Sequence, residues 1–253
     1  MAPRPFAAAA AKYQGRAPYS PQALALLAER FGLDRKTRVL DLGCGPGTLA
    51  LPLARLVGEV TAIDSEPAML DAGRARAREA GQDNIRWIES AAEALPPEMG
   101  VYRLAVMGQS FHWMDRDRVL ERLGGLIEDG GGIALVGPGR RRPQESWEPL
   151  AEAIARRHRG ERPAHPNERE PHNEPALLRS PCFAEFTVRE FSSQIERDAP
   201  SVLGCVLSLS FNASLVADAA FARELLAELG RLAPTGRFVE TIETEVLIAP
   251  KRV

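Results

Sequence analysis

Apolar and polar positions along the first half of the chain alternate in blocks that predict strands and helices in turn. Short apolar runs of strand length lie at residues 38–42, 59–64, 84–89, 101–107 and 132–136. Between them, apolar residues recur at helical spacing over 48–57 and 67–80 and after Asp115, a candidate helix cap. A further amphipathic helix, capped by Ser20, precedes the first strand. This rhythm predicts a parallel sheet with helices on both faces, which binds ligands at the carboxyl ends of its strands.

The second half of the chain follows a different pattern. Residues 140–181 are rich in arginine, proline, histidine and glutamate. The spacing of apolar positions predicts helices over 147–158, 199–210 and 218–232, and strands over 183–191 and 238–248. The two late strands complete the expected α/β fold class, a Rossmann-like sheet of seven mostly parallel strands. Extra helices are expected to cover a substrate site.

The chain has 253 residues, enough for one large α/β domain. We expect a single domain over residues 1–253, organised in four parts. These are an N-terminal arm and helix (1–31), a ligand-binding core (32–137), substrate-covering insertions around the sixth strand (138–236), and the final strand (237–253).

Composition narrows the possible partners. Hydrophobic residues make up 45% of the chain and charged residues 26%, as in soluble globular proteins. The net charge of −2 gives no general attraction to nucleic acid, so we expect none as a partner. The chain has no run of 18 apolar residues, which predicts no membrane span. Cys44, Cys182 and Cys205 are far apart in sequence, which favours a reduced, cytoplasmic protein.

The strongest motif follows the first predicted strand. Gly43, Gly45 and Gly47 allow the backbone to approach a ligand closely, and a helix begins just beyond them. The dinucleotide fingerprint requires a third glycine where Thr48 stands. The carboxylate of Asp41 is a poor neighbour for a pyrophosphate and suits a positively charged ligand. An ordinary strand–turn–helix corner without a ligand is the alternative.

Residues 39–48 resemble motif I of the class I S-adenosylmethionine-dependent methyltransferases, whose pattern is acidic-x-Gly-x-Gly. That cofactor carries an ammonium and a sulfonium and no phosphate. The resemblance covers residues 13–136 well and the rest of the chain poorly. It implies that S-adenosyl-L-methionine is the cofactor and that Asp41, Gly43, Cys44 and Gly45 bind it.

A second match follows the second predicted strand. Residues 62–70 resemble the second motif of the family, in which the acid that corresponds to Asp64 binds the ribose and the position of Met69 lies against adenine. Ser65 is taken as part of the same site. Asp64 could instead be a helix cap ahead of Pro67, and Met69 could be an ordinary core residue.

The segment after the third predicted strand departs from the family. The common sequence there is Gly-Asp-Ala-Glu-x-Leu-Pro, and its aspartate accepts a hydrogen bond from the adenine amino group. In this chain the matching position is Ala91. Adenine would then be read by backbone groups of Ala91 and Ala92, with Glu93 as a further candidate. Glu93 could also be a solvated acid at a helix start.

The N-terminal residues Tyr13, Arg16, Pro18, Tyr19 and Pro21 resemble a Tyr-x-x-x-Arg-x-x-Tyr-type segment found in part of the superfamily. The resemblance implies that Tyr13 and Arg16 fold over the cofactor and help to form the substrate pocket. A mobile arm is the alternative.

The fourth predicted strand leads into the candidate catalytic segment. His112 can act as a general base near neutral pH, which methyl transfer to a hydroxyl or an ammonium requires. Residues 109–113 resemble the Gln-x-Phe-His-Trp signature of a branch of small-molecule methyltransferases, and Gln109 is expected to line the cofactor site. Alternatively, Phe111 and Trp113 pack in the core and His112 bonds to the cofactor or a backbone group.

Other polar residues give weaker signals. His158, His165 and His172 recur at seven-residue spacing, but prolines interrupt the segment and no cysteine accompanies them, so we predict no metal site. The triplet at residues 140–142 could hold an anionic acceptor, and is more often a solvated turn.

These patterns predict a methyltransferase that acts on a hydroxyl or amine of a small-molecule metabolite or natural-product precursor. Methyltransferases of nucleic-acid bases carry Asn/Asp-Pro-Pro-Tyr after the fourth strand, whereas this chain has Met-Gly-Gln-Ser at 107–110. A non-catalytic binding protein of the same fold, which Ala91 favours, and a nicotinamide-dependent oxidoreductase are the alternatives. The sequence gives no signal for oligomeric state.

Overall fold

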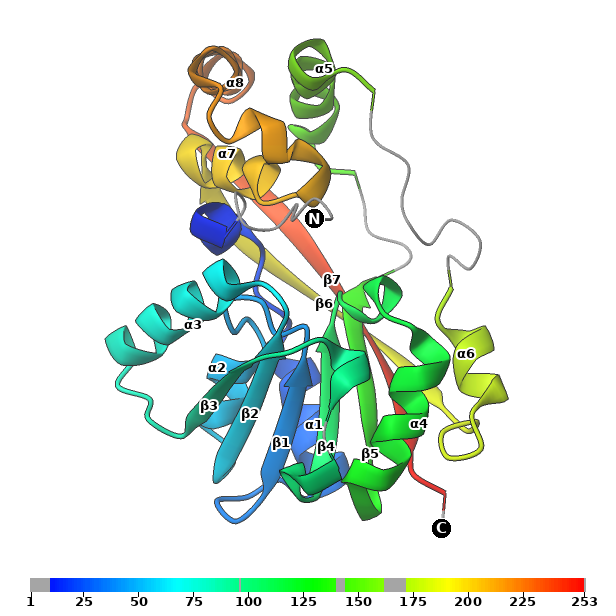
Figure 1. Cartoon of the computed structure of the whole chain (residues 1–253). Helices are drawn as coiled ribbons and strands as arrows, with labels where there is room; N and C mark the ends of the chain where they lie inside the picture. Colours follow the sequence, from blue (N-terminus) through cyan, green and yellow to red (C-terminus); the bar gives the residue numbers. More distant parts are fainter. Residues whose placement is uncertain (1–9, 96, 140–143, 162–171, 253) are drawn as a thin grey trace. The chain divides into compact units, whose positions relative to one another are not determined.

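A computed structural model describes residues 10–95, 97–139, 144–161 and 172–252 (Figure 1). The chain divides into two compact units. We call them the sheet unit, which comprises Tyr19–Gly139, His165–Phe191 and Thr244–Val253, and the helical unit, which comprises Met1–Pro18, Arg140–Ala164 and Ser192–Glu243. Within the described ranges, no helix is both long and apolar enough to cross a membrane.

The predicted seven-stranded sheet is confirmed. Its strands are β1 (Arg38–Leu42), β2 (Glu59–Asp64), β3 (Ile85–Glu89), β4 (Tyr102–Gly108), β5 (Ile127–Pro138), β6 (Thr187–Asp198) and β7 (Arg237–Pro250). They lie in the order β3-β2-β1-β4-β5-β7-β6 (Figure 1). Neighbouring strands from β3 to β5 are parallel, and β7 pairs antiparallel with β5. Strands β6 and β7 each have residues in both units.

Helices cover both faces of the sheet, as the sequence predicts. One face carries α1 (Pro21–Phe31), α2 (Ala50–Ala54) and α3 (Pro67–Glu79), and the other carries α4 (Arg116–Leu126) and α6 (Glu174–Arg179). Side chains alternate across β1. Val39 therefore packs in the core beneath α1, α2 and α3, and Leu40 packs in the core beneath α4 and α6. Asp115 caps α4 as predicted, because its carboxylate accepts a hydrogen bond from the N–H of Arg118. Ser20 precedes α1 but makes no side-chain cap.

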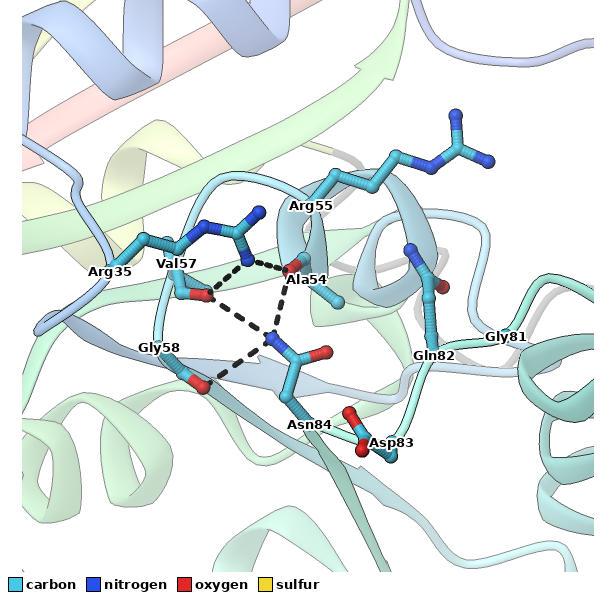
Figure 2. A pocket seen from close by; sticks show the side chains of 9 residues that line it. All are labelled: Arg35, Ala54, Arg55, Val57, Gly58, Gly81, Gln82, Asp83 and Asn84. Carbon is cyan, nitrogen blue, oxygen red and sulfur yellow. Dashed lines mark hydrogen bonds between the residues drawn. The ribbon is translucent and has the colours of Figure 1, made fainter.

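The helix after the glycine corner is shorter than predicted, and polar side chains cap its end. The sequence suggests a helix over 48–57, but α2 spans only Ala50–Ala54 and contains Pro52, which has no N–H to donate. The side-chain amide of Asn84 donates to the carbonyls of Ala54 and Val57, over 2.8 and 3.1 Å (Figure 2). These groups line a cavity of about 360 Å³. The cavity lies at the amino-terminal ends of β1, β2 and β3, whereas the glycine corner lies at the carboxyl end of β1.

The helical unit has its own core. It contains η1 (Ala10–Gly15), α5 (Glu148–Arg159), α7 (Ala199–Leu207), η5 (Ser210–Leu215) and α8 (Ala219–Leu232). Its core includes Trp147, Ile154, Phe221, Leu225 and Phe238. Arg197 and Glu240 form a buried ion pair between β6 and β7. Gly15 lies so close to Gly204 that a Cβ atom on Gly15 would lie 2.2 Å from the carbonyl carbon of Gly204.

Strand β6 and helix α6 also differ from the sequence-based expectation. The sixth strand was expected over 183–191, but β6 is Thr187–Asp198. Phe183 is fully buried in the core without belonging to a strand, and the later part of β6 has many polar residues, so the apolar alternation points to the wrong segment. Helix α6 was not expected, because six residues are too few to show a helical period.

Candidate cofactor-binding site

The glycine corner after β1 needs its glycines. Gly43, Gly45 and Gly47 have φ angles of 63°, 53° and 79°, which side chains disfavour. A Cβ atom on Gly43 would lie 2.5 Å from the Cβ atom of Ser110. The N–H of Cys44 donates to the carbonyl of Ile63 over 2.9 Å, which holds the corner beside the end of β2. The predicted positions Gly43, Cys44 and Gly45 therefore form one backbone corner at the carboxyl ends of β1 and β2.

Asp41 is a buried carboxyl group with an unused oxygen. Its residue is 1% exposed, and its Oδ2 atom has no hydrogen-bond partner in the described structure. The pKa of Asp41 is raised to about 8, mainly by burial; a hydrogen bond from the N–H of Ala50 lowers it, and the negative charge of Asp64 raises it. An unpaired buried carboxyl group is costly, and a cationic group next to it would remove the cost. Asp41 therefore fits a positively charged ligand group.

Asp64 connects the end of β2 to the glycine corner. Its Oδ2 accepts from the N–H of Gly45 over 2.8 Å, and its Oδ1 accepts from the N–H of Glu66 over 2.9 Å. Burial is the main cause that raises the pKa of Asp64. The cap of α3 is Glu66, whose carboxylate accepts from the N–H of Ala68, so the alternative of Asp64 as the helix cap is wrong. A carboxylate can accept about four hydrogen bonds, so Asp64 retains room for ligand hydroxyls.

The other predicted cofactor residues lie on the loops that follow β2 and β3. Ser65 is exposed, and Met69 is buried in the first turn of α3. The N–H of Ser90 donates to the carbonyl of Asp64 over 3.1 Å, which brings the loop that contains Ala91 and Ala92 next to the end of β2. Contact of these residues with the cofactor stays a prediction.

Glu93 has a partner that the sequence did not suggest. It lies in η2 (Ala92–Ala94) and is half-buried. Its Oε1 atom accepts a hydrogen bond from the N–H of Asp115 over 2.8 Å. Glu93 is therefore more than a solvated acid at a helix start, because it joins the loop after β3 to the beginning of α4.

The end of β4 is fixed next to the glycine corner. The Oγ of Ser110 donates to the carbonyl of Leu42 over 2.6 Å, and the N–H of Gln109 donates to the carbonyl of Val136 over 2.9 Å. Gln109 has a φ of 53°, the one positive φ of a non-glycine residue in the described structure. Such a conformation costs about 1–3 kcal/mol and concentrates at functional sites. This makes Gln109 a candidate site residue independently of the sequence motif.

His112 lies in η4 (Phe111–Trp113), next to a cavity of about 250 Å³ within the sheet unit. The polar residues that line the cavity are Gln109, Ser110, His112, Asn173, Glu174 and Glu245. Phe111 is 2% exposed and belongs to the core, whereas Trp113 is 37% exposed, so the expectation of a core position fails for Trp113. His112 and Gln109 both line this cavity; the expected place of Gln109 in the cofactor site stays a prediction. Asn173, Glu174 and Glu245 come from distant segments that no motif marks.

The remaining candidates are divided between the units. Tyr13 and Arg16 belong to the helical unit, where the Arg16 guanidinium lies 4.7 Å from the centre of the Tyr13 ring. Their contact with the cofactor stays a prediction. Tyr19 belongs to the sheet unit, and its hydroxyl would lie 2.7 Å from a Cβ atom on Gly108 at the end of β4.

The three histidines that recur at seven-residue spacing do not form a cluster in the described residues. His158 is in the helical unit and bonds to Asp218 and Glu224, each over 2.8 Å. His172 is exposed in the sheet unit, and His165 and residues 140–142 lie outside the described residues. Over the ranges that the structure describes, no three His, Cys, Asp or Glu side chains are grouped to hold a metal ion.

Comparison with known proteins bears on this site. Residues 39–131 match the family model of the methyltransferase domain. The chain is 39% identical over 99 residues to an uncharacterized methyltransferase of Mycobacterium tuberculosis, which covers 39% of this chain and 49% of that protein. It is 32% identical over 132 residues to the malonyl-[acyl-carrier protein] O-methyltransferase of Pseudescherichia vulneris, which covers 52% of this chain and 51% of that protein. The chain therefore spans about half the length of these curated relatives.

One solved structure has the same fold as this chain along nearly the whole length of both chains. The SAM-dependent methyltransferase from Thiobacillus denitrificans, in complex with S-adenosyl-L-homocysteine, matches with a TM-score of 0.55 and 19% identity. The match covers 99% of each chain. At this identity the likeness shows the fold alone.

Proposed function

We propose that the chain carries a domain of the class I S-adenosylmethionine-dependent methyltransferases, and that the whole protein transfers a methyl group from S-adenosyl-L-methionine to a small-molecule acceptor. The proposal depends on one observation. Two carboxyl groups, Asp41 and Asp64, flank a corner of bare backbone at the tips of β1 and β2.

The residues at this corner fit the cofactor of the family. The Oδ2 atom of Asp41, which has no hydrogen-bond partner in the described structure, suits the positively charged end of S-adenosylmethionine, and the remaining lone pairs of Asp64 suit the two ribose hydroxyls. Met69 and the backbone of Ala91 and Ala92 are the candidates for the adenine. When bound, the cofactor supplies a methyl group that its sulfonium already activates.

With an activated donor, the protein has to position the acceptor and remove its proton. The cavity next to His112 is the candidate acceptor site. Its volume of about 250 Å³ suits a small molecule or one arm of a larger one. A ring nitrogen of His112 would take the proton of the acceptor, because neutral imidazole is a base near pH 7. Gln109 would line the same cavity, with its backbone held by Val136.

We favour a hydroxyl or an amine as the acceptor group, and a metabolite or natural-product precursor as the acceptor. The similarity to a malonyl-[acyl-carrier protein] O-methyltransferase adds a carboxyl oxygen to the groups to be tested. Cys44, Cys182 and Cys205 are free thiols, which supports a reduced, cytoplasmic setting. Nucleic acid is not a proposed partner, because the net charge of the chain is −2.

Two other functions make different predictions. A non-catalytic binding protein, favoured by Ala91 in place of the adenine-binding acid, would bind the cofactor and transfer nothing. A nicotinamide-dependent oxidoreductase would have to place a diphosphate near Asp41, whose burial disfavours any added negative charge.

The test is a turnover assay with S-adenosylmethionine carrying a labelled methyl group. Pools of small hydroxyl, amine and carboxyl compounds serve as acceptors, and an assay without acceptor gives the background. We expect label in the product of at least one pool. Saturable cofactor binding with no transfer to any pool would instead support the non-catalytic alternative.

A further inference from the structure

The backbone turn that carries His112 is bonded at both of its ends, to the end of β1 and to the loop after β3. At its start, the Oγ of Ser110 donates to the carbonyl of Leu42, which immediately precedes Gly43. At its end, the N–H of Asp115 donates to the carboxylate of Glu93 over 2.8 Å. The first anchor is the last residue of β1, and the second lies in the loop after β3.

Within the turn, short-range bonds transmit these anchors to His112. The N–H of Trp113 donates to the carbonyl of Ser110 over 2.9 Å, and the N–H of Met114 donates to the carbonyl of Phe111 over 3.2 Å. The ring of Phe111 is buried in the core of the sheet unit, which adds packing contacts to the turn. These bonds connect the backbone around His112 to both ends of the turn.

The Glu93 anchor is electrostatically favourable. A hydrogen bond to a carboxylate is stronger than one between neutral groups. The N–H of Asp115 also lies directly before α4, where the helix dipole favours negative charge. The carboxylate of Asp115 is engaged elsewhere, since it accepts from the N–H of Arg118 over 3.2 Å. Glu93 is thus the group that holds this backbone N–H.

We propose that Glu93 is a positioning residue. It connects the loop after β3, which contains the adenine candidates Ala91 and Ala92, to the turn of His112, and it does not contact the cofactor itself. The proposal rests on the proposed function for its catalytic consequence, but not for its structural one. Removal of the carboxylate should release the end of the turn and displace His112. A displacement of about 1 Å can cost about 100-fold in rate.

The test compares Glu93→Ala, Glu93→Gln and Glu93→Asp with wild type. Glutamine keeps an acceptor oxygen at the same reach, whereas aspartate keeps the charge but is one methylene shorter. Glu98→Ala, which removes an exposed carboxylate five residues away, is the matched control. We expect Glu93→Ala and Glu93→Asp to lower kcat about tenfold to 100-fold. Glu93→Gln and the control should stay within about threefold of wild type, and the Kd for S-adenosylhomocysteine should stay within about twofold in every variant.

Hydrogen–deuterium exchange of residues 110–116 provides a readout without activity. We expect faster exchange at Asp115 in Glu93→Ala and Glu93→Asp and wild-type exchange in Glu93→Gln and the control. If wild type shows no turnover, the proposed function fails while the exchange data still decide the anchor. Unchanged exchange in Glu93→Ala would overturn the proposal. A Kd for S-adenosylhomocysteine that rises more than tenfold in both Glu93→Ala and Glu93→Gln would do so as well, and would make Glu93 a cofactor ligand.

Discussion

At the residue scale, the burial of Asp41 links cofactor binding to the release of a proton. Its pKa of about 8 keeps the carboxyl group of the free protein mostly protonated at pH 7. A positive ligand group next to Asp41 stabilises the carboxylate and lowers that pKa. The bound state then holds fewer protons than the free state, so affinity should rise with pH until the pH reaches about 8.

We therefore predict release of about one proton per cofactor bound at pH 7. Isothermal titration with S-adenosylmethionine in phosphate and in Tris buffers measures this number, because the two buffers differ in heat of ionisation. Asp41→Asn, which cannot ionise, should bind more weakly and show the same enthalpy in both buffers. Equal enthalpies for wild type in the two buffers would contradict a protonated Asp41.

His112 is the second residue with a defined role in the proposal. His112→Asn should lower kcat by about 10²–10⁴-fold, which is the usual contribution of a general base, and should leave the Kd for S-adenosylhomocysteine unchanged. His172→Asn is the control, since it changes an exposed histidine of the same unit. Turnover of His112→Asn at the wild-type rate would remove His112 as the base.

Sequence motifs located part of this site and missed the rest for a physical reason. Gly43, Asp41 and Asp64 were found because backbone approach and charge restrict which residues can stand there. Ser110 was missed, although its hydroxyl fastens β4 to β1, because a serine at a strand end has many possible uses. Glu174 and Glu245 reach the cavity only through the fold, since they lie far from His112 in sequence.

At the element scale, the sequence predicted strand bounds best where both faces of a strand are buried. The predicted bounds of β1 and β2 are the observed ones, Arg38–Leu42 and Glu59–Asp64. The predicted helix over 48–57 is too long, because the capping of α2 by Asn84 and Arg35 depends on residues distant in sequence. The bounds of β6 were wrong, because an edge strand with polar side chains carries little apolar signal.

The cap of α2 gives a prediction that separates folding from function. Asn84→Ala leaves the carbonyl of Val57 with only a long hydrogen bond from Arg35, over 3.5 Å (Figure 2). We expect a loss of about 1–2 kcal/mol in the free energy of unfolding. Asp83→Ala, an exposed neighbour in the same cavity, should stay within about 0.5 kcal/mol of wild type.

Urea unfolding measures both variants of this cavity, and cofactor titration is the second readout. The Kd for S-adenosylhomocysteine should not change in either variant, because the cavity lies at the amino-terminal ends of the strands and the glycine corner lies at their carboxyl ends. If Asn84→Ala weakened cofactor binding without a loss of stability, the purely structural role of this cap would be refuted.

At the scale of the whole molecule, the two units divide the predicted roles. The sheet unit contains Asp41, Asp64, Glu93 and His112, so every step derived above uses this unit alone. The helical unit has a separate core and holds Tyr13 and Arg16. Its proposed role as the cover of the substrate is a hypothesis that the sequence pattern supports.

The measurement that tests the account most directly is calorimetric titration of the full chain with S-adenosylhomocysteine and, separately, with NAD⁺. We predict one site for S-adenosylhomocysteine, no saturable binding of NAD⁺, and about 10–100-fold weaker S-adenosylhomocysteine binding for Asp64→Asn, which loses the charged acceptor. Preferential binding of NAD⁺, or equal affinity of wild type and Asp64→Asn for S-adenosylhomocysteine, would contradict the proposed role of the glycine corner and its two carboxyl groups.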